Sequence, residues 1–253
     1  MPNHCAMKFF LSVLLLTGLA AAAQKASFRE IRLRPLPRFE NTSDSTIVYP
    51  IVVMKNPAVG KRINARIREE IIGELPTKAS LRKDLAGMVR NGLTDLSYEA
   101  TFNRSGILSI TISQEEGNGP PVSRYFYLNF DLRTGKDLTV SDLIEDNKLD
   151  SFRTMVSSDK TDSIKRHLNR EKDDLARKEI DSVTYHWVVD EVTANCMDSA
   201  SIVNFSLTKD HIEIMDPCEL PWAIRSQEPE YGLLYTYTRL RGWMKPAFKG
   251  RLY

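Results

Sequence analysis

The sequence predicts an α+β fold in which helices pack on an antiparallel sheet. Strand-like runs are followed by a long helical run, without the regular strand-helix-strand alternation that a parallel sheet requires. Residues 125–132 alternate in a two-residue period, which is typical of a half-buried strand. The apolar members of this run form one face, and they are Phe126, Leu128, Phe130 and Leu132.

The first 23 residues are predicted to be a signal peptide. Lys8 precedes an apolar stretch over residues 9–19, and the four alanines of residues 20–23 offer a small-residue cleavage site. The stretch is shorter than the roughly 20 apolar residues that span a bilayer. We therefore expect a secreted or periplasmic protein that begins near Gln24 and has no membrane span in its mature chain.

Charge and length limit the classes of function. Removal of residues 1–23 takes away Lys8 and no acidic residue, so 35 basic residues become 34 against 33 acidic ones, a net charge of about +1. A dedicated nucleic-acid surface normally carries a clear basic excess, so no nucleic-acid partner is expected. About 230 residues are enough for two modest subdomains with cores of their own. We predict an N-terminal α+β subdomain over residues 24–115 and a C-terminal one over residues 116–253.

In the first half, residues 24–45 are expected to be extended and partly loose, and a strand is predicted over 47–53. An amphipathic helix follows, because apolar residues recur at every fourth position among charged ones, and these are Val59, Ile63, Ile67 and Ile71. A weaker helix is predicted over 78–90. A three-stranded antiparallel meander is then predicted over 96–102, 107–113 and 122–132.

In the second half, the Thr-Gly turn at 134–135 ends the last strand of the meander, and Ser141 is expected to cap a short helix. Residues 141–192 have helical periodicity, and the densely charged segment 160–178 is interpreted as a solvated helix face. A hairpin is predicted over residues 203–214, and a short helix near residues 239–244.

Two cysteines remain in the mature chain, Cys196 and Cys218. An even count in an exported protein favours a disulfide between them. Two buried free thiols remain the alternative, because sequence alone does not bring the sulfurs within reach of each other.

Catalytic and metal-binding patterns are weak. The three mature histidines, His167, His186 and His211, are scattered and form no zinc-binding spacing, and no nucleophile elbow occurs. We therefore predict no catalytic residue, no metal site and no cofactor. The one enzymatic alternative is a small glycan hydrolase that uses paired carboxylates drawn from Glu115, Glu116 and Asp131.

Aromatic residues gather near the C-terminus and form the candidate binding surface. Aromatic side chains are enriched at interfaces and can stack on ligands, although the same residues can instead seal the core. The candidates are Trp222, Tyr231, Tyr235, Tyr237 and Trp243.

Several segments carry a family resemblance. Residues 98–110, 127–136, 205–210, 221–223 and 235–240 resemble the extracytoplasmic domain of unknown function found in RsiV-type anti-sigma factors and in PdaC-type peptidoglycan deacetylases, ahead of their catalytic domain. The resemblance covers about Tyr49 to Lys245. It implies an α+β fold displayed outside the cytoplasmic membrane, and in the anti-sigma relatives this domain binds lysozyme.

Together these features predict a non-enzymatic binding protein of the bacterial cell envelope. Its expected ligand is a lysozyme-like protein or a peptidoglycan-related glycan. The competing prediction is the hydrolase described above.

Overall fold

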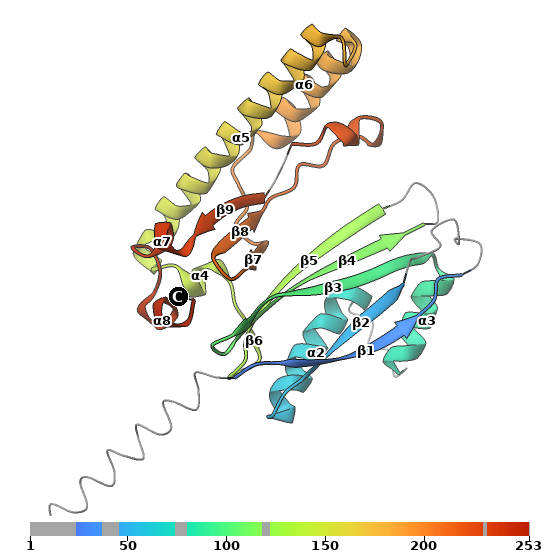
Figure 1. Cartoon of the computed structure of the whole chain (residues 1–253), viewed down its shortest axis with the longest axis vertical. Helices are drawn as coiled ribbons and strands as arrows, with labels where there is room; N and C mark the ends of the chain where they lie inside the picture. Colours follow the sequence, from blue (N-terminus) through green and yellow to red (C-terminus); the bar gives the residue numbers. More distant parts are fainter. Residues whose placement is uncertain (1–23, 37–45, 74–79, 118–121, 230–231, 253) are drawn as a thin grey trace, which may run out of the picture. The chain divides into compact units, whose positions relative to one another are not determined.

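The computed structural model describes residues 24–36, 46–73, 80–117, 122–229 and 232–252 (Figure 1). The predicted signal peptide, residues 1–23, lies outside them. The chain forms two compact units. The first unit comprises Met1–Leu138 with Ser206–Lys209 and Gly250–Tyr253, and the second comprises Thr139–Phe205 with Asp210–Lys249.

The observed boundary differs from the predicted one after residue 115. Strand β5 pairs with β4 along its whole length, from Glu116↔Val122 to Ile107↔Asp131. A boundary at residue 115 would separate the two strands of this hairpin. The first unit therefore extends to Leu138.

A six-stranded sheet forms the first unit, in the order β1-β2-β3-β4-β5-β6. Only β2 and β3 pair in parallel, because the helices α2 and α3 connect them as a crossover. The elements are β1 (Ser27–Leu33), β2 (Ile47–Val53), α2 (Pro57–Ile72), α3 (Leu81–Arg90), β3 (Leu93–Arg104), β4 (Ile107–Glu116), β5 (Val122–Asp131) and β6 (Lys136–Asp137).

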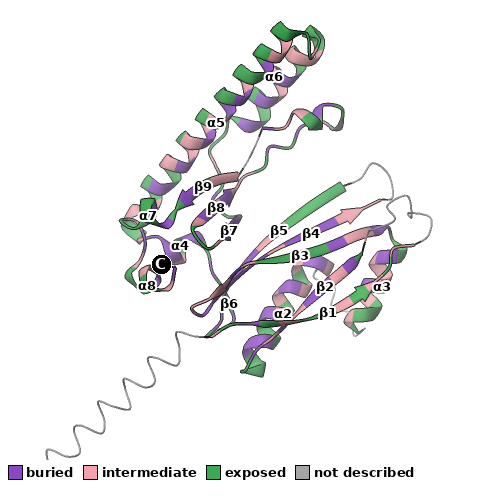
Figure 2. Ribbon diagram, in the orientation of Figure 1, coloured by how far each residue is buried: buried purple, intermediate pink, exposed green. Residues whose placement is uncertain are grey.

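Helix α2 confirms the predicted amphipathic helix. The Asn56 side chain accepts a hydrogen bond from the Ala58 N–H, and Pro57 occupies the first turn, where its missing N–H costs nothing. The predicted apolar stripe is the buried face of the helix, and its members are Val59, Ile63, Ile67 and Ile71. Figure 2 shows buried residues where α2 faces the sheet.

Gly135 in the turn between β5 and β6 has a structural requirement for glycine. Its φ is +71°, and an added Cβ would lie 3.0 Å from the carbonyl oxygen of Val59. The turn is held to the same helix by Arg62, whose guanidinium donates to the Thr134 carbonyl oxygen at 2.8 Å. The Thr-Gly turn therefore packs directly on α2.

Helices and the strands β8 and β9 form most of the second unit, and a second sheet has the order β7-β8-β9. Two elements are divided between the units, because residues 206–207 of β7 and residues 250–252 of α8 belong to the first unit. Helices α5 and α6 run antiparallel as a long hairpin (Figure 1). The elements that follow residue 138 are α4 (Val140–Leu143), η2 (Asp146–Lys148), α5 (Leu149–Arg177), α6 (Ser182–Cys196), β7 (Phe205–Leu207), β8 (His211–Met215), η3 (Trp222–Gln227), β9 (Gly232–Thr236), α7 (Tyr237–Leu240) and α8 (Pro246–Leu252).

The α+β class is confirmed, and three local predictions need correction. The cap of α4 is Thr139 and not Ser141, because Thr139 and Asp142 form a reciprocal capping box. Residues 27–33 are a strand, since β1 pairs with β2. The face of α5 expected to be solvated buries Lys160, His167 and Glu171, which are all less than 9% exposed.

None of the described helices combines the length and the apolar character needed to cross a membrane.

Candidate functional site

The predicted aromatic surface is mostly interior where it is described. Tyr235 is 1% exposed and Tyr237 is 4% exposed, so both belong to the core, and Trp243 is half-buried. Tyr231 and the side chain of Trp222 lie outside the described residues. Burial raises the pKa of the Tyr235 hydroxyl, and a neighbouring carboxylate raises it further.

Asp131 lies too far from the other two carboxylates that were candidates for a hydrolase. Asp131 lies opposite Ile107 at one end of β4, whereas Glu116 lies nine residues along the same strand. At about 3.4 Å per residue this separation is about 30 Å. Glycoside hydrolysis needs two carboxyl groups about 5 to 9.5 Å apart. Neither Glu116 nor its neighbour Glu115 can therefore act together with Asp131.

Asp131 instead forms a buried ion-pair cluster in the first unit. Its Oδ2 accepts from Arg251 Nη1 at 3.0 Å and from Arg133 Nη2 at 2.9 Å. Burial acts to raise the pKa of Asp131, but hydrogen bonds from Arg133 and then from Arg251 lower it to about 2. Arg251 also donates to the carbonyl oxygens of Ser105 and Gly106. This cluster ties residues 250–252 to the β3–β4 turn and to the end of β5.

A second returning segment, residues 206–209, is held on the same unit by hydroxyl groups. The buried Ser109 hydroxyl accepts from the Leu207 N–H at 3.0 Å. Thr101 Oγ1 lies 2.9 Å from Ser206 Oγ. These contacts and the Asp131 cluster serve the fold, because each connects a late segment of the chain to the sheet.

In the second unit, Cys196 and Cys218 are joined by a disulfide, with their Cα atoms 5.2 Å apart. The bond links the end of α6 to the segment that follows β8. It lies in a small core with Ile164, Val188 and other apolar residues. The predicted pairing is present, and the thiols are not free.

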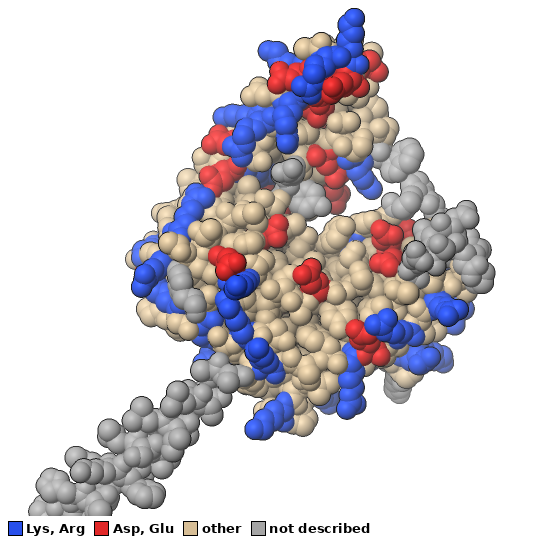
Figure 3. All heavy atoms as spheres, in the orientation of Figure 1, with Lys and Arg blue, Asp and Glu red and all other residues tan. Residues whose placement is uncertain are grey.

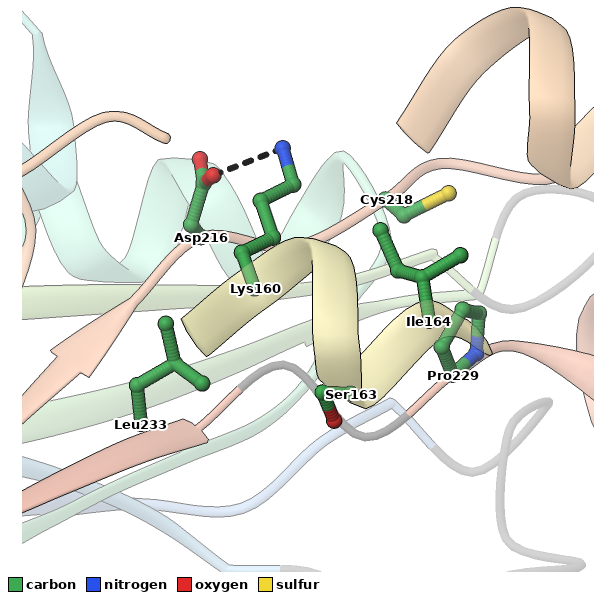
Figure 4. A pocket seen from close by; sticks show the side chains of 7 residues that line it. All are labelled: Lys160, Ser163, Ile164, Asp216, Cys218, Pro229 and Leu233. Carbon is green, nitrogen blue, oxygen red and sulfur yellow. Dashed lines mark ion pairs between the residues drawn. The ribbon is translucent and has the colours of Figure 1, made fainter. Parts of the chain in front are cut away.

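Lys160 fixes α5 to the end of β8. Its Nζ lies 2.8 Å from Asp198 Oδ1 and 2.8 Å from Asp216 Oδ2. Figure 4 shows the Lys160 and Asp216 side chains pointing toward one another beside Cys218. The space enclosed there is only about 10 Å³, enough for one water molecule at most. This cavity is part of the packing and is too small for a ligand.

A larger groove adjoins that cavity, because Ser163 and Leu233 line both. It lies between α5 and β9 and has a volume of about 340 Å³, near the lower end of the range for small-molecule sites. Its lining is mainly polar. The residues that line it are Asp159, Asp162, Ser163, Arg166, Gly232, Leu233, Leu234, Tyr235 and Arg239.

Charges of both signs are placed along the groove. Arg239 Nη2 lies 3.0 Å from Asp159 Oδ2, which neutralises that pair. Arg166 is exposed, and among the described residues it makes no ion pair or hydrogen bond. Asp162, one helical turn before Arg166, also lines the groove, and its Oδ1 lies 3.9 Å from Lys165 Nζ. Arg166 is therefore the lining cation that has no ion-pair partner among the described residues.

Metal binding has no support in the described part of the chain, where no group of three histidine, cysteine or acidic residues could hold an ion. His167 lies on α5 with Nε2 3.8 Å from Glu171 Oε1, and His211 begins β8. On the face drawn in Figure 3, basic and acidic side chains are interspersed over the helical hairpin of α5 and α6.

Sequence reasoning did not find this groove. Asp162 and Arg166 lie in segment 160–178, whose dense charge predicts a solvated helix face, and Asp159 lies directly before it. Strand β9 was not predicted, so the edge beside that face could not be placed.

Comparison with known proteins shows similarity at the level of the fold alone. No family model matches the chain. No curated protein matches it significantly. Two solved structures of the DUF3298 family share its fold. One, from Bacteroides fragilis, has a TM-score of 0.57 and 13% identity, over 92% of this chain and 98% of that one. The other, from Pseudomonas aeruginosa, has a TM-score of 0.52 and 14% identity, over 88% and 95%.

Proposed function

We propose that this protein is an exported, non-enzymatic binding protein of the cell envelope, which holds its ligand in the groove between α5 and β9. The observation that carries the proposal is the groove itself, with its polar lining and its exposed Arg166. Candidate ligands are a lysozyme-like protein and a peptidoglycan-related glycan. The resemblance to the RsiV-type and PdaC-type domains supports both ligands, and the DUF3298 fold is compatible with it.

Binding without catalysis agrees with the chemistry of the lining. Ser163 is its one hydroxyl group on α5, and the described lining contains no histidine or cysteine beside it. The carboxylate of Asp159 is held by Arg239. These groups can orient a polar ligand through hydrogen bonds and charge, which is the usual role of the few polar groups in a binding site.

A charge-reversal experiment tests the site. Purified protein is incubated with lysozyme and, separately, with purified peptidoglycan, and the bound fraction is measured for the wild type, Arg166→Glu and Lys172→Glu. Lys172 is an exposed cation on the same helix that does not line the groove. We expect binding of one ligand to fall by about tenfold in Arg166→Glu and to stay unchanged in Lys172→Glu.

The same preparations should show no turnover of peptidoglycan. If the wild type releases reducing sugar and a well-folded groove variant does not, the protein is a hydrolase and the proposed binding function is wrong. Absence of binding to both ligands would remove them as candidates.

Export is tested separately. N-terminal sequencing of protein recovered from the envelope or the medium should give a start at or near Gln24. A mature form that retains residues 9–19 in the membrane would contradict it.

A further inference from the structure

Strand β9 has one edge without a strand partner, because it is the last strand in the order β7-β8-β9. In an antiparallel ladder, the N–H and C=O of one residue point to the same side, and the side alternates from residue to residue. The register of β8 and β9 therefore decides which main-chain groups of β9 face outward.

One hydrogen bond fixes that register. The Met215 N–H donates to the Asn204 carbonyl oxygen at 2.8 Å, on the β7 side of β8. The main-chain groups of Met215 therefore point away from β9. Gly232 lies opposite Met215, so its own N–H and C=O point away from β8. By alternation, those of Leu234, opposite Glu213, point outward as well.

The outward main-chain groups of Gly232 and Leu234 are available for hydrogen bonding to another chain. Within the described residues, the N–H and C=O of Gly232 and Leu234 have no hydrogen-bond partner on this side. The Leu234 side chain is also exposed, at 58%. An edge of this kind is a template for pairing with another extended chain.

The groove follows this edge. Four consecutive residues, from Gly232 to Tyr235, line it. Neighbouring residues of a strand point to opposite faces, so a wall made of four in a row is the edge of the strand and not one of its faces. Asp159, Asp162 and Arg166 form the other wall, on one face of α5.

An extended peptide matches this arrangement better than a glycan does. Its main chain repeats a donor and an acceptor every second residue, about 6.8 Å apart, which is the spacing of the outward groups of Gly232 and Leu234. Addition of a strand to an exposed sheet edge is a general mode of peptide recognition. Arg166, which has no ion-pair partner among the described residues, favours a peptide that carries a carboxylate.

We propose that the groove binds an extended peptide with an acidic group, which adds to β9 as a fourth strand and places its carboxylate on Arg166. This proposal rests on the binding function assigned above to the same groove.

The test uses a displayed library of random ten-residue peptides, selected on the folded full-length mature protein. The peptide most enriched is synthesised, and its affinity is measured for the wild type and four variants. Leu234→Pro removes the outward N–H and leaves the β8 ladder intact, since proline is tolerated on an edge strand when its nitrogen faces outward. Leu234→Ala keeps the N–H and is the matched control.

We expect the affinity to fall by about tenfold or more in Leu234→Pro and in Arg166→Glu, and to change by less than about twofold in Leu234→Ala and Lys172→Glu. Peptide binding should also slow hydrogen exchange at the Leu234 amide. The enriched sequences should contain an acidic residue.

A second measurement does not depend on the folding of the proline variant. N-methylation of alternate residues in the peptide should abolish binding to the wild-type protein in one register and leave it unchanged in the other, because only every second amide faces β9. Equal effects in both registers, or failure of the library to yield a binder, would overturn the proposal.

The outcomes separate this proposal from the binding function. Capture of lysozyme or peptidoglycan that depends on Arg166 but not on the Leu234 amide would leave the binding function standing and refute strand addition. Concentration-dependent dimers that are lost in Leu234→Pro would identify a second copy as the occupant, and would also refute the peptide proposal. Peptidoglycan turnover at the groove would refute the binding function.

Discussion

Replacement of Asp131 by asparagine tests the buried ion-pair cluster of the first unit. The hydrogen bonds from Arg133 and Arg251 lower the pKa of this carboxyl group from 3.8 to about 2, against the effect of burial. The side chain is only 10% exposed, so screening by solvent is limited. A difference of one pH unit in pKa corresponds to about 1.36 kcal/mol, so Asp131→Asn should cost about 2 kcal/mol at pH 7.

The pH dependence has a defined sign. The pKa of Asp131 is lower in the folded than in the unfolded state, so its contribution is fully present above the unfolded value of about 3.9 and is lost as the pH falls toward about 2. The wild type should therefore lose about 2 kcal/mol across this window that Asp131→Asn does not lose. At pH 2 the two proteins should approach each other in stability.

Peptide-resolved hydrogen exchange on β4 and β5, followed against urea, measures the first unit. The three tryptophans, at 187, 222 and 243, all belong to the second unit, so tryptophan fluorescence follows that unit separately. The matched control is Asp137→Asn, in which an exposed ion pair with Arg66 is lost at a cost of less than about 1 kcal/mol. An Asp131→Asn effect no larger than this control, or an unchanged acid dependence, would refute the reasoning.

Three further predictions concern single contacts. Phe130→Ala should lower the free energy of unfolding by about 3 to 5 kcal/mol, because the ring is fully buried, and urea unfolding of the first unit measures this; a cost below about 1 kcal/mol would contradict the packing. Burial and then the carboxylate of Glu115, opposite on β4, raise the pKa of Asp95, so its ionised form is disfavoured in the folded state. Asp95→Asn should therefore raise the melting temperature at pH 7, and the stability of the wild type should rise as the pH falls through the pKa of Asp95. A lower melting temperature in the variant would contradict this. Reduction of the Cys196–Cys218 bond should destabilise the second unit by about 3 kcal/mol without unfolding it, and tryptophan fluorescence in the presence and absence of reductant measures the difference; complete unfolding on reduction would show that the core there is insufficient.

Local periodicity in the sequence is sufficient to predict the helices and strands that have a strong pattern of their own. The stripe from Val59 to Ile71 and the alternation before Leu132 are read within one helix or one strand, and both α2 and β5 are present. The α+β class was predicted for the same reason. These signals do not depend on which segments meet in space.

The features that could not be predicted depend on tertiary contacts between segments that are far apart in the sequence. Asp131 alternates with the apolar residues of its strand, a pattern that predicts a solvent-facing side chain. It is nevertheless 7% exposed, because Arg251 returns from much later in the chain to contact it. Lys160 looked like part of a solvated face, but Asp198 and Asp216 lie against it. Strand β9 was missed because its pairing with β8 defines it, and the groove along its edge was missed with it.

The interleaved path of the chain sets an order of events during synthesis. The first unit takes in residues 206–209 and 250–252, so its sheet emerges from the ribosome long before the segments that complete it. Arg251 cannot reach Asp131 until the 120 residues that separate the two in the sequence have been made. A nascent chain stalled or cleaved before residue 250 lacks Arg251, and Asp131 then has only Arg133 as an ion-pair partner within the described residues. The unit that emerges first is therefore completed only after the second unit has been synthesised.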